Sequence, residues 1–259
     1  MLEAGRELAI EAGAALTIEH LRVEEIIQRA RVPRSSAYRM WPYREDYIDD
    51  LLVYLAGAGN WFAERPVFDP ETFTVLKQVV EDNRALIAQP GGRRALLQEV
   101  VRLTVAQNYG ALTESGTWRL HMALSATLGS TRSGEARQKI AAALEESQRV
   151  SRESLIAVFG WVAQELGLRL RDPAATVEHM QLAGGLLVQG VALRNVQVRA
   201  AVDGGDAGEA ARVDTLLNAP LPGPGLHGQP AEWTLAAFAY MGVVDAFVEL
   251  DPDFIPPER

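Results

Sequence analysis

One short segment of the chain has the residue types that bind a polyanion. Residues 29–44 read RARVPRSSAYRMWPYR and contain five arginines and no acid. A guanidinium donates paired N–H groups to phosphate, and the same donors match the major-groove edge of guanine. The hydroxyls of Ser35, Ser36, Tyr38 and Tyr43 add further hydrogen-bonding groups. This pattern predicts a surface for phosphates and base edges of nucleic acid.

The chain as a whole has the opposite charge. Its 259 residues include 34 acidic and 25 basic side chains, a net charge of -9. That total argues against a nucleic-acid partner, because phosphate binding needs clustered cations. However, residues 29–44 carry +5, which leaves -14 over the remaining residues. A concentrated cationic face is able to hold phosphates, while the acidic remainder repels DNA and limits nonspecific binding.

Two short helices joined by a turn are predicted to position the cationic segment. The first covers 22–29, where apolar residues have helical spacing. The residue before Pro33 is disfavoured in the α region, so the helix ends at 31–33, and Pro33 favours a second helix over Arg34–Met40. Such a pair matches the helix-turn-helix arrangement, whose second helix enters the major groove of DNA. The free amides of the next helix, which starts near Arg44, are able to meet a phosphate.

Almost every other extended stretch also has helical spacing, and alternating strand patterns are missing. A Pro/Gly-rich connection over 203–231 is expected to be irregular apart from one short helix at Glu209–Asn218, and the tail PDFIPPER is expected to fray. The fold class is therefore all-α. The other expected helices cover 2–12, 45–64, 69–88, 94–109, 117–128, 135–167, 172–201 and 231–250.

The stretch from Leu2 to Leu52 resembles the DNA-binding domain of tetracycline-repressor (TetR) family transcriptional regulators. Its core reads EEIIQRARVPRSSAYRMWPYREDYIDDLL, and the family pattern is roughly I-A-x-x-A-G-V-S-x-x-x-[LI]-Y-x-[YH]-F-x-[SN]-K-x-x-L. The matching framework positions are Ile26, Ala30, Val32, Tyr38, Trp41, Arg44 and Tyr47. The departures are Arg31 for Gly, Pro33 for Ser, Trp41 for Phe, Arg44 for Lys, and a longer connection between Gly13 and Ile26, with LTIEHLRVEE where a Thr cap is expected.

The resemblance implies two helical domains. A three-helix helix-turn-helix domain covers 1–52, a connecting helix covers 45–64, and a helical-bundle domain over 60–259 binds a small molecule and dimerises. It also implies a role for each residue of the cationic segment. Base edges are faced by Arg34, Ser35 and Ser36, phosphates are held by Tyr38 and Arg44, and either role is open to Arg39 and Tyr43.

The partners implied by the resemblance are a palindromic operator in double-stranded DNA, a second copy of the chain and an unidentified small-molecule effector. The expected protein is cytoplasmic, needs no cofactor or metal, and is a repressor released from DNA by its effector. The segments 172–199 and 231–250 are candidates for the dimer face. Gly184, Gly185 and Gly190 would allow close helix approach there, although a monomer would bury these helices as core.

Candidate effector-pocket residues are Trp118 and His121 on one helix and Trp161 on another. Binding pockets are built from aromatic side chains and a few polar groups in an apolar interior. The alternative is that these three are ordinary packing residues.

Other classes of protein have less support. The absence of Cys excludes disulfides and thiolate chemistry. An acidic cluster at Glu45, Asp46, Asp49 and Asp50 would suit Mg²⁺ in a helical enzyme, but a second cluster is missing and a helix dipole already accounts for acids there. The histidines lack paired-ligand spacing, and neither a secretory signal nor a membrane span is present. The main alternative is a helical ligand-binding or interaction protein without specific DNA recognition.

Overall fold

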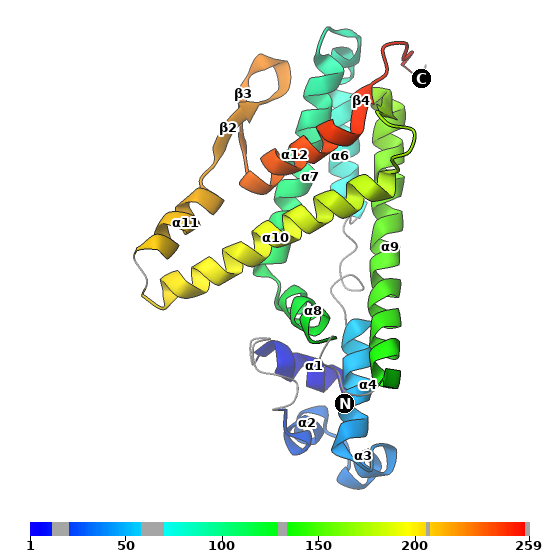
Figure 1. The fold of residues 1–259 in the computed structure, drawn as a ribbon, viewed down its shortest axis with the longest axis vertical. Helices are drawn as coiled ribbons and strands as arrows, with labels where there is room; N and C mark the ends of the chain where they lie inside the picture. Colours follow the sequence, from blue (N-terminus) through cyan, green and yellow to red (C-terminus); the bar gives the residue numbers. More distant parts are fainter. Residues whose placement is uncertain (12–20, 58–69, 129–133, 206–207, 257–259) are drawn as a thin grey trace. The chain divides into compact units, whose positions relative to one another are not determined.

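A computed structural model describes residues 1–11, 21–57, 70–128, 134–205 and 208–256 (Figure 1). Most of these residues are helical, which confirms the predominantly α-helical fold class. The chain divides into two compact units. Unit 1 comprises Met1–Pro66 and Ser115–Ser151, and unit 2 comprises Val67–Glu114 and Arg152–Arg259. This division differs from the expected boundary near residue 60, because residues 115–151 belong to unit 1.

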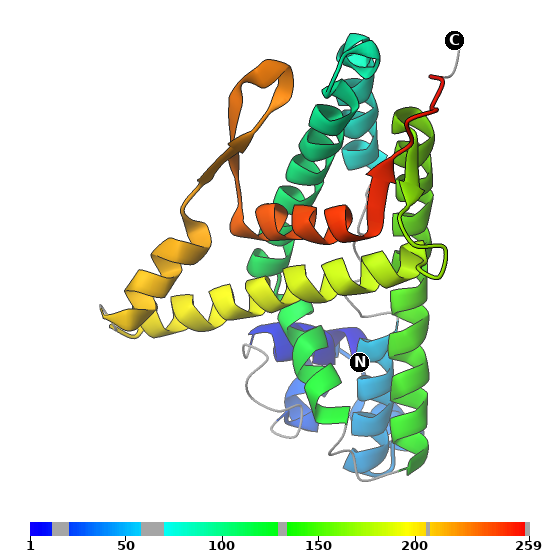
Figure 2. The same ribbon diagram turned by 45° about the horizontal axis from the view of Figure 1, so that its top comes forward.

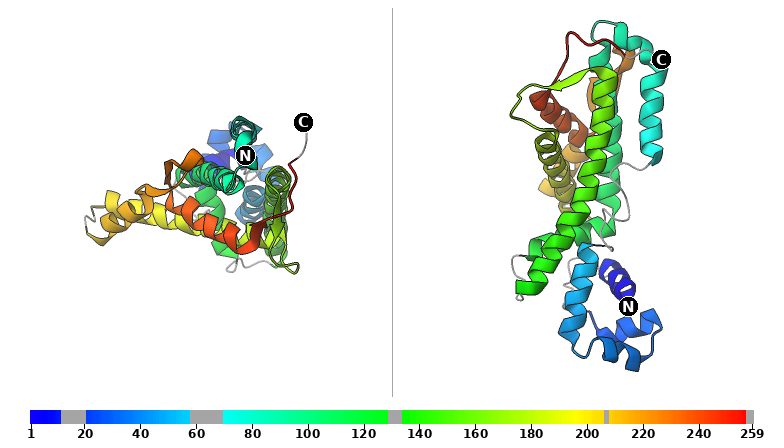
Figure 3. Two further views of the ribbon diagram at one scale, coloured as in Figure 1. Left: turned by 90° about the horizontal axis from the view of Figure 1, so that it is seen from above. Right: turned by 90° about the vertical axis from the view of Figure 1, so that its right-hand side faces the viewer.

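In the part that the structure describes, unit 1 contains the helices α1 to α4 and a second, later segment of the chain, which begins at Ser115. Helix α1 packs against α2 and α4 (Figure 3), and α8 packs against α1 and α4. The first part of α9, up to Ser151, also belongs to this unit. The bounds are α1 (Leu2–Glu11), α2 (Val23–Ala30), α3 (Arg34–Met40), α4 (Arg44–Ala56), α8 (Gly116–Thr127) and α9 (Gly134–Leu166).

Tyr47 lies at the centre of the unit 1 core. Its side chain is fully buried, and its hydroxyl donates to the Met1 carbonyl at 3.1 Å. Gly5 of α1 faces this hydroxyl so closely that a Cβ at that position would collide with it. Trp41 meets the Tyr47 ring edge-on, with centroids 5.2 Å apart. One aromatic residue on α4 therefore ties α1 and the end of α3 together.

The turn between α2 and α3 depends on an unusual backbone conformation. Arg31 closes α2 with φ 54° and ψ 37°, the left-handed region, and its amide donates to the Gln28 carbonyl at 3.2 Å. A left-handed residue at this position is the common way to end a helix, and it usually is Gly because a Cβ is disfavoured there. Pro33 then precedes α3 in an extended conformation. The expected Arg34–Met40 helix is confirmed in both bounds.

Unit 2 is built around three helices that pack against one another. These are α7 (Gly92–Glu114), α10 (Val177–Asp203) and α12 (Leu235–Phe247). Helix α6 (Pro70–Asp82) and the short 3-10 helix η2 (Arg84–Ala88) cover α7, and α11 (Glu209–Asn218) packs on α10 (Figure 1). Each of these helices, with the second part of α9, falls within an expected helical range or extends it by a few residues.

The expectation that strands are missing was wrong. Strands β1 (Leu168–Leu170) and β4 (Val248–Leu250) form one antiparallel pair, and β2 (Leu221–Pro224) and β3 (Pro230–Trp233) form another. The second pair is a hairpin that leads from α11 to α12 (Figure 2). It is stabilised by Trp233, whose indole N–H donates to the Pro224 carbonyl at 3.0 Å. The Pro/Gly-rich stretch is therefore a packed element rather than an irregular one.

Three helices have bounds that differ from expectation. Helix α10 starts at Val177 rather than 172, because Asp172 accepts the amide of Ala174 in a turn and Thr176 caps the helix. Helix α12 spans 235–247 because strands take the residues on either side of it. Helix α4 ends at Ala56 with a cap at Gly57, and the rest of the expected 45–64 helix lies outside the described residues.

The C-terminal tail was expected to fray, but its first residues, up to Phe254, are held in place. The Asp251 amide donates to the Gly167 carbonyl at 2.8 Å, and Phe254 packs over Gly167, which has φ 62°. The guanidinium of Arg93 lies 5.2 Å from the centre of the Phe254 ring and also donates to the Asp251 carbonyl. Apolar contact and charge together anchor residues 251–254.

Arg31→Gly should stabilise the protein against unfolding. Glycine adopts the left-handed conformation without the clash of a Cβ, so the free energy of unfolding should rise by about 1 kcal/mol. Urea denaturation monitored by circular dichroism measures the change. Arg31→Ala is the matched control, because it removes the same charge and keeps the Cβ, and it should give no gain. Equal stabilisation by both variants would show that charge, not conformation, limits this turn.

Candidate nucleic-acid interface

Helix α3 exposes nearly all of its side chains. Ala37 is its buried residue, while Arg34, Ser35 and Ser36 in the first turn and Arg39 further along are exposed. A seven-residue helix that buries one alanine contributes little to the core. Its arginines and the hydroxyls of Ser35 and Ser36 are therefore exposed to an external partner.

Tyr38 lies on the same helix and has a carboxylate partner. Its side chain is 44% exposed, and its hydroxyl donates to Oε1 of Glu24 on α2 at 3.0 Å. This hydrogen bond is the main cause that raises the pKa of Tyr38 above its ordinary value. Sequence reasoning assigned the hydroxyl of Tyr38 to phosphate and did not find this contact, because the two residues lie on different helices.

Tyr43 and Arg44 lie at the start of α4. Tyr43 is the N-cap residue and its side chain is 71% exposed. No side-chain cap satisfies the first amides of α4, so these N–H groups remain compatible with an anion. The Arg44 guanidinium is exposed and donates to the Leu21 carbonyl at 3.5 Å, which places it against the residues that precede α2.

Arg29, the first cation of the segment, has a structural partner on another helix. Its guanidinium donates to both carboxylate oxygens of Glu11 at 2.8 Å and lies 3.5 Å from Glu7. These contacts raise the pKa of Arg29. The pair joins α1 to α2, so Arg29 belongs to the scaffold of the segment and not to its exposed cationic face. No spacing rule links residues so far apart in sequence.

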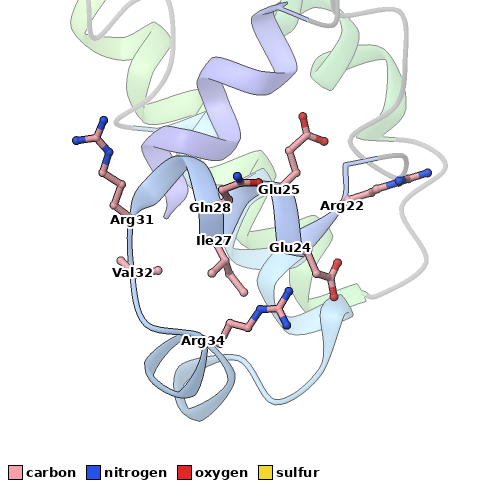
Figure 4. A pocket seen from close by; sticks show the side chains of 8 residues that line it. All are labelled: Arg22, Glu24, Glu25, Ile27, Gln28, Arg31, Val32 and Arg34. Atoms are coloured by element: carbon pink, nitrogen blue, oxygen red, sulfur yellow. The ribbon is translucent and has the colours of Figure 1, made fainter.

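Two open surface grooves bring several of the candidate residues together. One, of about 550 Å³, is lined by Tyr38, Tyr43 and Arg44 together with Arg22 and Glu24. The other, of about 470 Å³, is lined by residues of α2, the turn and the start of α3 (Figure 4). Its residues are Arg22, Glu24, Glu25, Ile27, Gln28, Arg31, Val32 and Arg34. Ser35, Ser36 and Arg39 are exposed on α3 outside these linings. Arg22 and Glu24, which sequence reasoning did not select, line both grooves.

The three candidate effector residues do not lie in one unit. Trp118 and His121 are buried in unit 1, whereas Trp161 belongs to unit 2, where it meets Phe73 edge-on with centroids 5.3 Å apart. The indole N–H of Trp118 has no hydrogen-bond partner within the described part of the chain. Trp161 thus packs against an aromatic ring of its own unit, and Trp118 keeps an unsatisfied buried donor.

Neither a metal site nor a membrane span is found among the described residues. Over these ranges, no three His, Asp or Glu side chains are grouped to hold a metal ion. In the acidic cluster, burial and the neighbouring Asp46 and Asp50 raise the pKa of Asp49, and Asp50 accepts the indole N–H of Trp41 at 2.8 Å. Within the same ranges, no helix combines the length and apolar character needed to cross a bilayer.

Comparisons of this chain with protein-family models, with curated proteins and with solved structures found no match. Membership of the TetR family thus stays a prediction, and it depends on the framework residues of 2–52 that match the family pattern.

The stability of the protein should fall as the pH drops from 6.5 towards 4, because of His121. Burial lowers the pKa of His121 from 6.5 to about 4. The unfolded chain then binds a proton that the folded chain excludes, so acid favours unfolding in this window. The loss should approach about 3 kcal/mol at the lower end.

Urea denaturation across this pH range measures the effect, with His121→Gln as the comparison. The variant removes the titrating group, so its stability should change less with pH. Identical pH profiles for both proteins would contradict the role of His121.

Proposed function

We propose that this chain is a DNA-binding transcriptional regulator of the TetR type, a repressor that a small-molecule effector releases from a palindromic operator. The observation that carries the proposal is the α2–turn–α3 pair, in which α3 exposes Arg34, Ser35, Ser36 and Arg39 and buries Ala37 alone. In a helix-turn-helix protein the second helix lies in the major groove, where such side chains meet base edges and phosphates.

The roles proposed for α3 follow from the chemistry of its side chains. Arg34 in the first turn is able to donate two hydrogen bonds to O6 and N7 of guanine, and the hydroxyls of Ser35 and Ser36 accept or donate at neighbouring bases. Tyr38 and Arg44 supply phosphate contacts, which fix the register of a protein on the duplex. Either a base edge or a phosphate is open to Arg39 and Tyr43.

A homodimer is supported by two exposed apolar stripes in unit 2. On α10 the stripe comprises Leu182, Leu186, Gly190 and Leu193, and on α12 it comprises Phe238, Gly242 and Ala246. The two helices pack side by side in Figure 1. A Cβ added at Gly190 or Gly242 would meet no neighbouring element of the described chain within 4 Å. At Gly184, by contrast, a Cβ would collide with the Tyr240 ring, so this glycine serves packing inside the protomer. Exposed apolar stripes with small residues fit a two-fold pairing of helices.

Release by an effector would be a shift between two conformations of the dimer. The effector binds better to the conformation whose recognition helices do not match two half-sites about 34 Å apart. Trp118 and His121 remain the candidates for effector contact, because both are buried and the indole N–H of Trp118 lacks an acceptor within the described residues. The alternative, an interaction protein that does not recognise DNA, predicts no salt-dependent binding to duplexes.

Arg34→Ala should weaken binding to the operator by about 1–3 kcal/mol and leave binding to random duplex DNA nearly unchanged. The operator is first selected with the wild-type protein from a pool of randomised duplexes, and affinities are then measured by fluorescence anisotropy at several salt concentrations. Arg44→Ala is the matched variant, since it removes a guanidinium assigned to phosphate. It should weaken binding to all duplexes and lower the salt slope by about 1. A wild-type protein without salt-dependent DNA binding would refute the proposed function.

Leu186→Glu should dissociate the proposed dimer. Leu186 lies in the middle of the α10 stripe with 61% of its surface exposed, so a charge there is harmless in a monomer but unfavourable in an apolar interface. The dimer dissociation constant should rise by at least about thirtyfold in sedimentation equilibrium. Leu216→Glu on α11, where the leucine is 56% exposed outside the stripes, is the control and should leave the constant unchanged. A dimer unaffected by Leu186→Glu would place the interface elsewhere.

A further inference from the structure

We infer that Glu24 takes the place of a DNA phosphate at the start of α2, and that it thereby weakens the binding of the free protein to duplex DNA. This inference rests on the proposed function and adds a residue that controls affinity at the same surface. It concerns the hydrogen-bond donors around one exposed carboxylate.

The donors around Glu24 are those that a helix-bound phosphate uses. Glu24 lies in the first turn of α2, a helix whose N-cap residue Arg22 offers no side-chain cap. Its carboxylate accepts hydrogen bonds from its own backbone amide and from the hydroxyl of Tyr38. The charges of Arg34 and Arg22 act on the same carboxylate. Backbone amides at a helix start, a hydroxyl and guanidinium groups form a typical phosphate site.

These contacts favour the ionised form of the carboxylate. The amide and Tyr38 hydrogen bonds, followed by the charges of the two arginines, lower the pKa of Glu24 below its ordinary value of 4.5. At neutral pH the groove therefore already contains an anion. In Figure 4 the side chains of Glu24 and Arg34 point towards each other, while Arg31 points away on the other side of the groove.

Glu24 lies where both grooves meet, since it lines each of them. A phosphate that approaches Tyr38 competes for one phenolic proton that Glu24 already accepts, and it also meets a like charge. The neighbouring Glu25 has the same charge and lies on the same helix turn, yet it lines one groove, and among the described residues the hydrogen bond of the Tyr38 hydroxyl goes to Glu24 and not to Glu25. Variants of the two glutamates therefore distinguish local competition with a phosphate, expected at Glu24, from a general effect of removing one negative charge, expected at both.

Glu24→Gln should tighten the binding of the full-length protein to random duplex DNA by about tenfold. A neutral amide binds the Tyr38 hydroxyl and the Arg34 guanidinium more weakly than a carboxylate does, so a phosphate can bind them instead. The slope of log affinity against log salt should become steeper by about 0.9, the change expected for one additional phosphate contact. Glu25→Gln removes the same charge and should tighten binding by less than about threefold without a new phosphate contact.

Tyr38→Phe tests whether the phenol takes part. In the wild-type protein it should weaken duplex binding less than it does in the Glu24→Gln protein, because Glu24 already accepts the phenolic hydrogen. In the Glu24→Gln protein it should remove most of the gain and restore the original salt slope. A merely structural role for Glu24 would change thermal stability but not the slope, so thermal unfolding of each variant is measured in parallel.

The outcomes separate this inference from the proposed function. If neither the wild-type protein nor Glu24→Gln binds duplex DNA at low salt, the proposed function fails and the inference fails with it. If the wild-type protein binds DNA but Glu24→Gln and Glu25→Gln shift affinity and slope equally, Glu24 acts as an ordinary surface charge. That result overturns the inference and leaves the regulator proposal intact.

Discussion

The arrangement of unit 1 depends on the burial of Tyr47. This side chain joins α4 to α1 through its hydrogen bond to the Met1 carbonyl and through the close approach of Gly5, and it supports Trp41 at the end of α3. Because these contacts hold α3 from its C-terminal end, the helix needs no core of its own beyond Ala37. Its polar side chains can then serve an external partner without loss of packing.

Local features of the sequence predicted the helices that position the candidate site. Pro33 marks the start of α3, and the apolar spacing of Ile26 and Ile27 marks the buried face of α2. The conformation of Arg31 could be inferred only from the family pattern, which has Gly at this position. Propensity would not place an arginine in the left-handed region, because a Cβ is disfavoured there.

Contacts between distant residues limited the prediction of the site. The cationic segment contains no acid in sequence, but in space Arg29 meets Glu11 and Tyr38 meets Glu24. Charge counted along a chain therefore overstates the positive charge that reaches the surface. The strands were missed for a related reason: proline discouraged a strand assignment, yet the hairpin is held by a tryptophan whose partner lies nine residues away.

The prolines of this hairpin also decide what its outer edges can do. The β2–β3 register pairs Pro222 with Glu232 and Pro224 with Pro230. The pair Gly223 and Ala231 lies between these two proline-bearing pairs. In an antiparallel ladder the residues of one alternate set point their N–H groups away from the partner strand. Three of the four residues in the proline-bearing pairs have no N–H to offer. The ribbon thus lacks the row of donors that would recruit a strand from another molecule, so it is protected from edge-to-edge aggregation.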